Sequence, residues 1–241
     1  GGRCIITKKG LNFPPLHEWP VEPREAVELQ RRLASRVEMR VFRRRPRLLA
    51  GLDVAFSPDA RTTIAGVVVW DAGCGRVVER RIARCATTFP YVPGLLSFRE
   101  LPAALEAFRA LECTPDAVLC DAQGIAHPRR MGLACHLGLW LRVPTIGCAK
   151  SRLCGDSGEP GFLRGAWAAL RLDGERVGVV LRTRDRVRPL FVSPGHLCDL
   201  AAARRITLDA CTRYRLPEPT RLAHQMVTRA RCSAEHEAFR A

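Results

Sequence analysis

The chain has 241 residues, 47% of them hydrophobic, so it is long enough for one large domain with a sizeable buried core. Its formal net charge of +15 favours a polyanionic partner such as nucleic acid, because Lys and Arg side chains neutralise phosphates. No apolar run approaches the roughly 18 to 20 residues of a membrane helix, so we expect a soluble cytoplasmic protein with no membrane partner.

Residues 1–15 contain a basic pair but no apolar stretch of the kind found in secretory signals. We expect them to form a poorly ordered N-terminal segment in front of a single domain at residues 16–241. The eleven cysteines stand singly, with no Cys-x-x-Cys pair, which fits a reducing cytoplasm better than a disulfide or zinc framework. Arginine accounts for most of the positive charge, and the Arg, Ala, Gly and Pro richness of a GC-rich genome is an alternative explanation of the charge.

Residues 21–40 are predicted to form an amphipathic helix, because Ala26, Leu29, Leu33 and Val37 recur at helical spacing. Three strand candidates follow, at Leu48–Phe56, Thr63–Asp71 and Arg76–Cys85. The turn residues between them predict an antiparallel meander.

After Pro93 the pattern changes to alternating helices and strands. We predict helices at Gly94–Leu111, His127–Leu141, His196–Ala203 and Thr220–Ala230, and strands at Asp116–Asp121, Val143–Cys148, Arg176–Thr183 and Arg188–Val192. The first two of these strands are expected to be parallel because a crossover helix joins them. A meander followed by such crossovers is typical of an α/β, ribonuclease H-like mixed sheet flanked by helices.

Two aspartates occupy positions of interest on the predicted sheet. Asp53 lies inside the apolar strand candidate Leu48–Phe56, where a carboxylate needs a partner, a hydrogen-bond network or a metal. The alternative is the solvated face of an edge strand. Asp121 ends a predicted parallel strand, where α/β proteins collect ligands, although an aspartate in a turn can also cap its own backbone.

Glu100 has two interpretations that its spacing does not separate. Ser97-Phe98-Arg99-Glu100 matches the S-x-x-E capping box, in which the glutamate folds back onto the N-cap amide. The other interpretation is a site carboxylate.

Three further polar residues are candidates. Lys150 follows a predicted strand in a chain that otherwise uses Arg, which suggests a compact charge facing a phosphate, although chance retention is the alternative. His127 precedes a predicted helix and His224 lies in the last one; either is an ordinary surface histidine, or a neutral imidazole that orients water or binds metal.

Tyr91 stands in a loop that Pro90 and Pro93 stiffen. A rigid aromatic side chain of this kind can wedge between bases or stack on them. Its alternative role is a plug for the sheet edge.

A series of blocks carries a resemblance to a known family: Ala50–Asp53, Pro90–Leu96, Phe98–Glu100, Asp121–Gly124, His127–Arg130, Pro144–Gly147, Ala149–Ser151, Ser193–His196 and Pro217–Arg221. In these blocks, from about Leu16 to Arg231, the chain closely resembles the endonuclease V family, which consists of deoxyinosine-directed nucleases of nucleic-acid repair. The Tyr91–Glu100 block is the most distinctive of them.

The resemblance implies roles for particular residues. Asp53, Glu100 and Asp121 match the metal-binding catalytic acids, with Lys150 and His224 completing the catalytic set. Tyr91, Pro90 and Pro93 match a wedge; Gly94, Leu96, Gly132 and Leu133 match the wall of a hypoxanthine pocket; His127 and Lys150 match residues near the scissile phosphate. The implied cofactor is Mg²⁺, with Mn²⁺ as a substitute.

The resemblance also implies the reaction. The family cuts the second phosphodiester bond on the 3′ side of deoxyinosine and leaves 3′-hydroxyl and 5′-phosphate ends. The implied partner is deoxyinosine-containing DNA, with inosine-containing RNA as a second candidate, bound by a monomer. A non-catalytic binder of deaminated or branched nucleic acid is the alternative from another class.

Two positions depart from the family pattern. Ala122 stands where the family usually has glycine, so a methyl group narrows the base pocket or excludes a positive φ angle. Ala55 replaces the usual hydroxyl residue two positions after Asp53.

Overall fold

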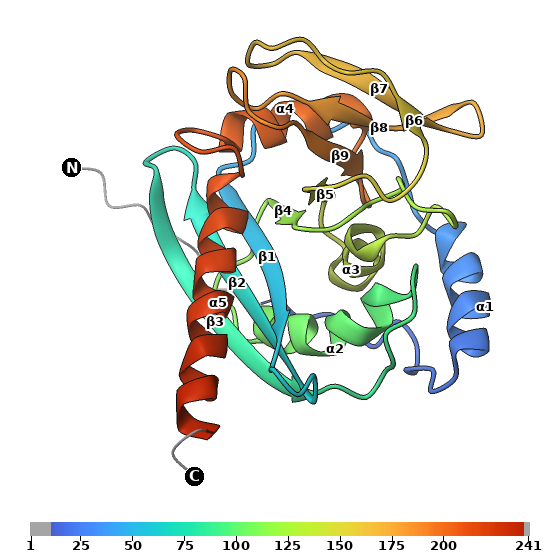
Figure 1. The fold of residues 1–241 in the computed structure, drawn as a ribbon, viewed down its shortest axis with the longest axis vertical. Coiled ribbons are helices and arrows are strands. Elements are labelled where there is room, and N and C mark those ends of the chain that lie inside the picture. The colour runs from blue at the N-terminus through green and yellow to red at the C-terminus, as the bar shows by residue number, and fades with distance from the viewer. Residues whose placement is uncertain (1–10, 239–241) are drawn as a thin grey trace.

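The computed structural model describes residues 11–238 (Figure 1). Residues 1–10 of the predicted N-terminal segment therefore lie outside the described residues. Of the remainder of that segment, Phe13 is buried and packs edge-on against Trp140. Within residues 11–238 no disulfide joins the cysteines. In the same range, none of the helices combines the length and the apolar character that a membrane span needs.

A nine-stranded mixed sheet forms the centre of the molecule, in the order β3-β2-β1-β4-β5-β9-β8-β7-β6. Its strands are β1 (Leu48–Phe56), β2 (Thr62–Asp71), β3 (Arg76–Ala86), β4 (Ala117–Cys120), β5 (Thr145–Ala149), β6 (Asp156–Ser157), β7 (Trp167–Leu172), β8 (Glu175–Leu181) and β9 (Leu190–Pro194). The first three form the predicted antiparallel meander, and β1, β4 and β5 run parallel. The predicted ribonuclease H-like mixed sheet is confirmed.

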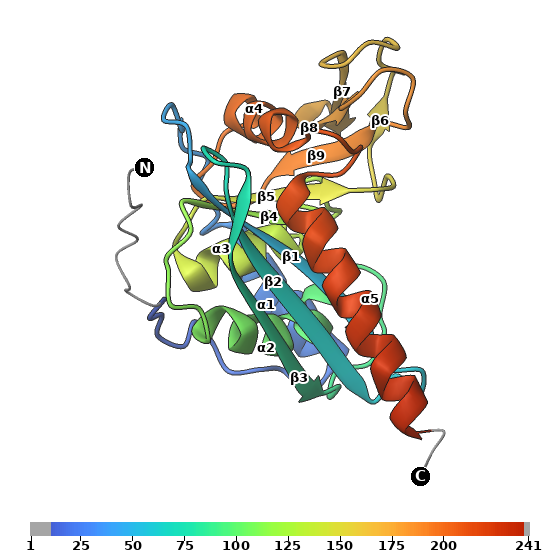
Figure 2. The same cartoon turned by 90° about the vertical axis from the view of Figure 1, so that its left-hand side faces the viewer.

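Five helices cover the sheet: α1 (Pro23–Ala34), α2 (Leu96–Arg109), α3 (Leu133–Leu141), α4 (Leu200–Ala210) and α5 (Glu218–Ala238). Successive side chains of a strand point to opposite faces, so β4 places Val118 in the core under α2 and α3 and Leu119 in the core under α4. Figure 2 shows α5 crossing the meander on the face opposite α2 and α3. The helix α1 lies outside these layers, where its Leu33 packs with Phe98 and Leu139.

Several predicted boundaries were wrong. The helix predicted at 21–40 ends at Ala34, because the segment that follows is held against the loop after β9: Glu38 N–H donates to His196 Nδ1, and Leu197 N–H donates to the Glu38 carbonyl. The helix predicted from His127 begins only at Leu133, because turns occupy the intervening residues. The strands β6 and β7 were not predicted.

The later boundaries also moved. The structure gives α2 two residues fewer at each end than predicted, and the helix predicted at 196–203 runs from Leu200 to Ala210. The helix predicted at 220–230 extends from Glu218 to Ala238. None of these shifts changes the order of the elements.

Candidate active site

Asp53 and Asp121 lie side by side on neighbouring parallel strands. Leu52 of β1 aligns with Cys120 of β4, so the two aspartates are the next residues in register, and Asp121 N–H donates to the Leu52 carbonyl at 3.2 Å. Since β1 lies between β2 and β4, the edge-strand alternative for Asp53 is wrong. The sheet therefore brings two carboxylates together at the end of β4.

The start of α5 brings His224 to the same place. A Cβ atom on Gly51 would lie 2.1 Å from the backbone carbon of Pro219, so only glycine lets α5 begin in contact with β1. Six residues into α5, His224 Nδ1 lies 2.8 Å from Asp53 Oδ2. The sequence identified His224 only through the family resemblance, because no local pattern shows that α5 crosses β1 here.

Lys150 follows β5 directly and forms an ion pair with Asp121 Oδ2. The side chain of Asp121 is 14% exposed and that of Lys150 38%, so the ammonium group lies at the open end of the pair. The pair leaves part of the ammonium surface accessible to a phosphate.

Glu100 lies on α2, close enough to Asp53 and Asp121 for their charges to act on it, but outside the group of ligand atoms that Asp53, Asp121 and His224 form. The helix begins at Leu96 after the N-cap Leu95, so Ser97 is a helical residue, and its hydroxyl bonds His136 Nδ1 at 3.0 Å. The capping-box interpretation is therefore wrong. Burial raises the pKa of Glu100 to about 8, and the Asp53 and Asp121 carboxylates raise it as well.

The three carboxylates repel one another in a partly buried place. Burial raises the pKa of Asp53, and Asp121 raises it further, against the lowering effect of His224. One ligand atom from each of Asp53, Asp121 and His224 lies within 4.8 Å of the others. A divalent cation would remove this repulsion, and carboxylate oxygens are the ligands that hard cations prefer. The donor set therefore fits a metal of this kind.

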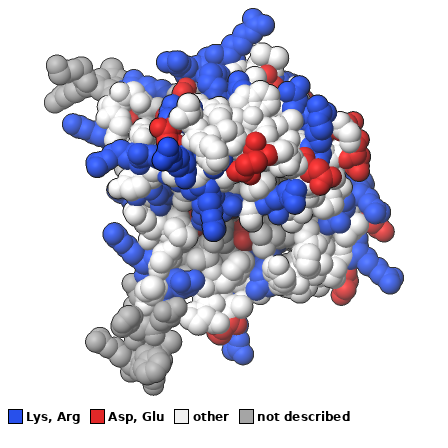
Figure 3. All heavy atoms as spheres, turned by 45° about the horizontal axis from the view of Figure 1, so that its top comes forward, with Lys and Arg blue, Asp and Glu red and all other residues white. Residues whose placement is uncertain are grey.

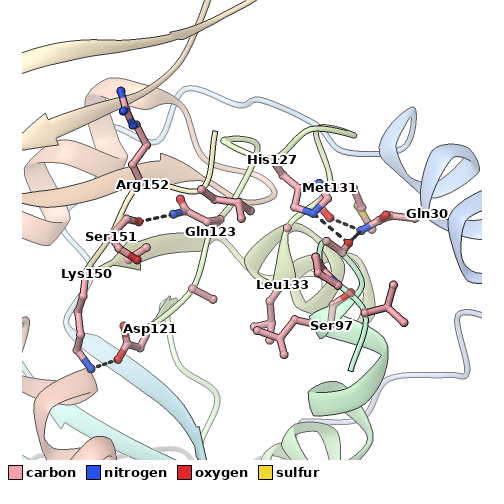
Figure 4. A pocket seen from close by; sticks show the side chains of 18 of the residues that line it. Gln30, Ser97, Asp121, Gln123, His127, Met131, Leu133, Lys150, Ser151 and Arg152 are labelled. Carbon is pink, nitrogen blue, oxygen red and sulfur yellow. Dashed lines mark hydrogen bonds and ion pairs between the residues drawn. The ribbon is translucent and has the colours of Figure 1, made fainter. Parts of the chain in front are cut away.

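A cavity of about 410 Å³ opens next to the carboxylates. Figure 4 shows Asp121 and Lys150 at one end of it, with Gln30 and His127 at the other. Most of the residues predicted to bind substrate line this cavity: Tyr91, Pro93, Gly94, Leu96, His127, Gly132 and Leu133. Pro90 is exposed and lies outside the lining.

The wall of the cavity is braced at Gly94, whose φ angle of +79° favours glycine. Its carbonyl oxygen accepts hydrogen bonds from Gln30 Nε2 at 2.9 Å, His127 Nε2 at 3.0 Å and Arg129 Nη2 at 2.9 Å. The other ring nitrogen of His127 accepts from Arg129 N–H at 3.1 Å. Burial and the Arg129 charge lower the pKa of His127 to about 4, so this imidazole is neutral and fully engaged within the protein.

Tyr91 lies at the rim of the cavity and is 72% exposed. This exposure contradicts the plug interpretation. Leu96, also on the rim, is 38% exposed. An exposed aromatic ring therefore lies beside a pocket that is large enough to hold a nucleobase.

Ala122 lines the cavity between Asp121 and Gln123. Its φ angle is not in the positive region, so the methyl group causes no backbone strain there. Of the two expected effects of the Ala122 methyl group, only the narrowing of the pocket therefore applies.

Sequence reasoning missed Gln30, which is 1% exposed and also donates to the Met131 carbonyl at 2.8 Å. A signal was present, because Gln30 stands four residues after Ala26 on the buried stripe of α1. A polar residue on such a stripe indicates a specific hydrogen-bond partner.

Comparisons with known proteins agree with this geometry. A family model described as Endonuclease V matches residues 31–225. An Azotobacter vinelandii protein named Endonuclease V is 49% identical over 215 residues, which cover 89% of this chain and 97% of the relative. The crystal structure of Endonuclease V from Streptomyces avermitilis has a TM-score of 0.86 at 41% identity, covering 94% of this chain and all of that one.

A more distant structure, Endonuclease V of Ciona intestinalis in complex with a 24mer DNA containing an inosine followed by a ribo-adenosine, has a TM-score of 0.73. It is 24% identical and covers 86% of this chain and 96% of that one, so its similarity shows the fold alone.

Proposed function

Because the chain belongs to the endonuclease V family and is therefore an endonuclease, we propose that its substrate is DNA containing deoxyinosine. The proposed cut is at the second phosphodiester bond on the 3′ side of the lesion, leaving 3′-hydroxyl and 5′-phosphate ends. One observation carries the proposal: a cavity large enough to hold a nucleobase and a cluster of carboxylates share Asp121 and Lys150 as a common wall.

We propose Mg²⁺ as the cofactor, with Mn²⁺ as a substitute. Asp53, Glu100 and Asp121 would hold it, with His224 beside them. When bound, such a cation supplies positive charge that stabilises the attacking and leaving oxygens of the displacement at phosphorus.

The side chains around the carboxylates have separate tasks. Lys150 presents its ammonium group to the scissile phosphate, and its ion pair with Asp121 fixes where the charge stands. His224 donates Nδ1–H to the Asp53 carboxylate, which leaves Nε2 as an acceptor that can orient the attacking water. His224 is 49% exposed, so water reaches it directly.

The cavity and its rim select the base. Taking a base out of the stack costs a few kcal/mol, and less where its pairing is weak, so mismatched inosine leaves the helix more readily than a paired base. Tyr91 fills the gap in the stack, since its exposed ring lies at the rim, and Pro90 and Pro93 limit the loop's freedom. The braced turn at Gly94 then forms the wall against which the base lies.

The test is cleavage of matched DNA and RNA strands, each with one inosine and a 5′ label, in Mg²⁺. We expect wild type to cut the DNA strand and Asp121→Asn to leave it intact. Asp59→Asn, a change at an exposed turn after β1, is the matched control and should retain activity. Cleavage of RNA alone would assign an inosine ribonuclease, and binding without any cleavage would assign a non-catalytic binder.

We further propose that the protein acts as a monomer in the cytoplasm. The absence of disulfides among residues 11–238 is consistent with a reducing compartment. Light scattering during gel filtration should return a mass near 26.8 kDa; a mass twice as large would contradict the monomer.

A further inference from the structure

Tyr214 is one of two tyrosines in the chain, and like Tyr91 it is exposed to solvent, in this case by 49%. It lies in the loop between α4 and α5. The Arg221 guanidinium lies 4.2 Å from the centroid of its ring. Arg221 is itself held by Glu218 Oε2, at 3.2 Å from Nε and 2.7 Å from Nη2. The ring therefore rests on a fixed cation, and part of its surface faces solvent.

The loop that carries Tyr214 is tied to the active site. Arg215 donates to the Arg188 carbonyl at 2.7 Å, to the Pro189 carbonyl at 2.9 Å and to the Lys150 carbonyl at 3.4 Å. The Arg215 carbonyl accepts from Thr183 Oγ1 at 2.7 Å. These bonds fix the loop next to the residue that presents a charge to the phosphate.

The cavity and the loop that carries Tyr214 both contact Lys150. Asp121 and Lys150 form one wall of the cavity, and Lys150 also contacts the Tyr214 loop through its carbonyl. Arg221 stands three residues before His224, so the two lie on the same side of α5. Tyr91 is thus connected to the carboxylate cluster through the lining of the cavity, and Tyr214 through Lys150 and α5.

The surroundings of Tyr214 carry positive charge. Arg213, which precedes Tyr214, is exposed, as is Arg188, whose carbonyl accepts from Arg215; on the face that Figure 3 shows, Lys and Arg cover more of the surface than Asp and Glu. A basic surface with an exposed aromatic ring is the combination that holds single-stranded nucleic acid, because cations attract the backbone and the ring stacks on a base.

We propose that Tyr214, supported by Arg221, is a stacking platform for a nucleobase of the substrate strand on the 3′ side of the cut. The inference rests on the proposed function: a strand whose inosine fills the cavity and whose cut lies 3′ to it continues from the carboxylates towards Tyr214. The platform positions the strand and takes no part in the chemical step.

Steady-state kinetics on an inosine-containing single strand tests the platform. A stacked base contributes about 1 to 3 kcal/mol, so Tyr214→Ala should raise KM at least about fivefold while kcat stays unchanged. Tyr214→Phe keeps the ring and should behave as wild type. Trp167→Ala removes another exposed ring that packs with an arginine, Arg204 at 4.7 Å on the α4 side, and serves as the matched control with no change in KM.

A second series locates the stacked base. Abasic sites are placed one at a time at the positions 3′ of the cut. At one of these positions the abasic site should raise the KM of wild type by a similar factor. The KM of Tyr214→Ala should not rise further at that position. Equal KM values for wild type and Tyr214→Ala would overturn the platform. So would increases in KM from the abasic site and from the substitution that are independent of each other at every position. If wild type does not cut inosine strands at all, the proposed function itself fails, and the platform fails with it.

Discussion

Acidification should destabilise the folded chain through His127, which braces the turn at Gly94. Both ring nitrogens are engaged in the folded state, one with the Gly94 carbonyl and the other with Arg129 N–H. A second proton on the ring would break the bond from Arg129 N–H and place a charge in a buried position. Burial accordingly lowers the pKa of His127 from 6.5 to about 4.

The sign and size of the effect follow from this pKa difference. Between pH 6.5 and 4 the unfolded chain binds a proton at His127 that the folded chain does not, so stability falls as the pH falls. The contribution of this one histidine to the free energy of unfolding should drop by about 2 kcal/mol between pH 7.5 and pH 5.

Urea unfolding at several pH values measures this contribution when wild type is compared with His127→Gln, which keeps a donor for the Gly94 carbonyl and does not titrate. The variant should be less stable than wild type at pH 7.5, because Arg129 N–H loses its acceptor. The difference in the free energy of unfolding between the two proteins should become smaller towards pH 5 or change sign. The comparison also cancels the pH dependence of the carboxylates, which is the same in both proteins. A gap that is independent of pH would refute the assignment of a neutral, buried His127.

Three further predictions concern the site. Gly51→Ala should destabilise the chain by about 1 to 3 kcal/mol and lower activity, because its Cβ would meet Pro219 and displace α5 with His224. Urea unfolding measures the loss of stability. Gly158→Ala, where a Cβ meets open space, is the neutral control. Ala122→Gly should raise the ratio of kcat/KM for xanthine-containing strands over inosine-containing strands severalfold, because it removes a methyl group from the cavity wall; an unchanged ratio would show that this methyl does not limit the pocket. Mg²⁺ should raise the thermal midpoint of wild type and restore activity after chelation, whereas Asp53→Asn should show a much smaller rise; equal shifts in both proteins would place the metal elsewhere.

The meander and the parallel pair could be predicted because their signals are local. Alternating apolar runs bounded by turns mark β1 to β3, and the crossover helix fixes the parallel direction of β4 and β5. Once that order was assigned, Asp53 and Asp121 had to lie at neighbouring strand positions. The central acids of the site therefore follow from pattern and topology.

The missed hairpin of β7 and β8 had a signal of its own. Asp173 and Gly174 both have positive φ angles, at 53° and 80°, and Leu172 pairs with Glu175 across the two-residue turn. An Asp-Gly pair between two apolar runs is a strong indication of such a hairpin.

Other features depend on contacts between distant parts of the chain. The position of His224 follows from the contact of α5 with Gly51, and the neutral state of His127 follows from a turn that Gln30 helps to hold. The Ser97 to Glu100 spacing left open a capping box that does not form, because the hydroxyl of Ser97 bonds His136 instead. Such contacts are invisible to periodicity and spacing.

The position of the cut in a 5′-labelled DNA strand with a single inosine, read at single-nucleotide resolution in Mg²⁺, tests the proposed reaction most directly. We expect one labelled product that ends with the nucleotide following inosine and carries a 3′-hydroxyl that a polymerase can extend. The same strand without inosine should stay intact. A product that ends elsewhere, or equal cleavage of the two strands, would contradict the arrangement of a base cavity and a carboxylate cluster that share Asp121 and Lys150.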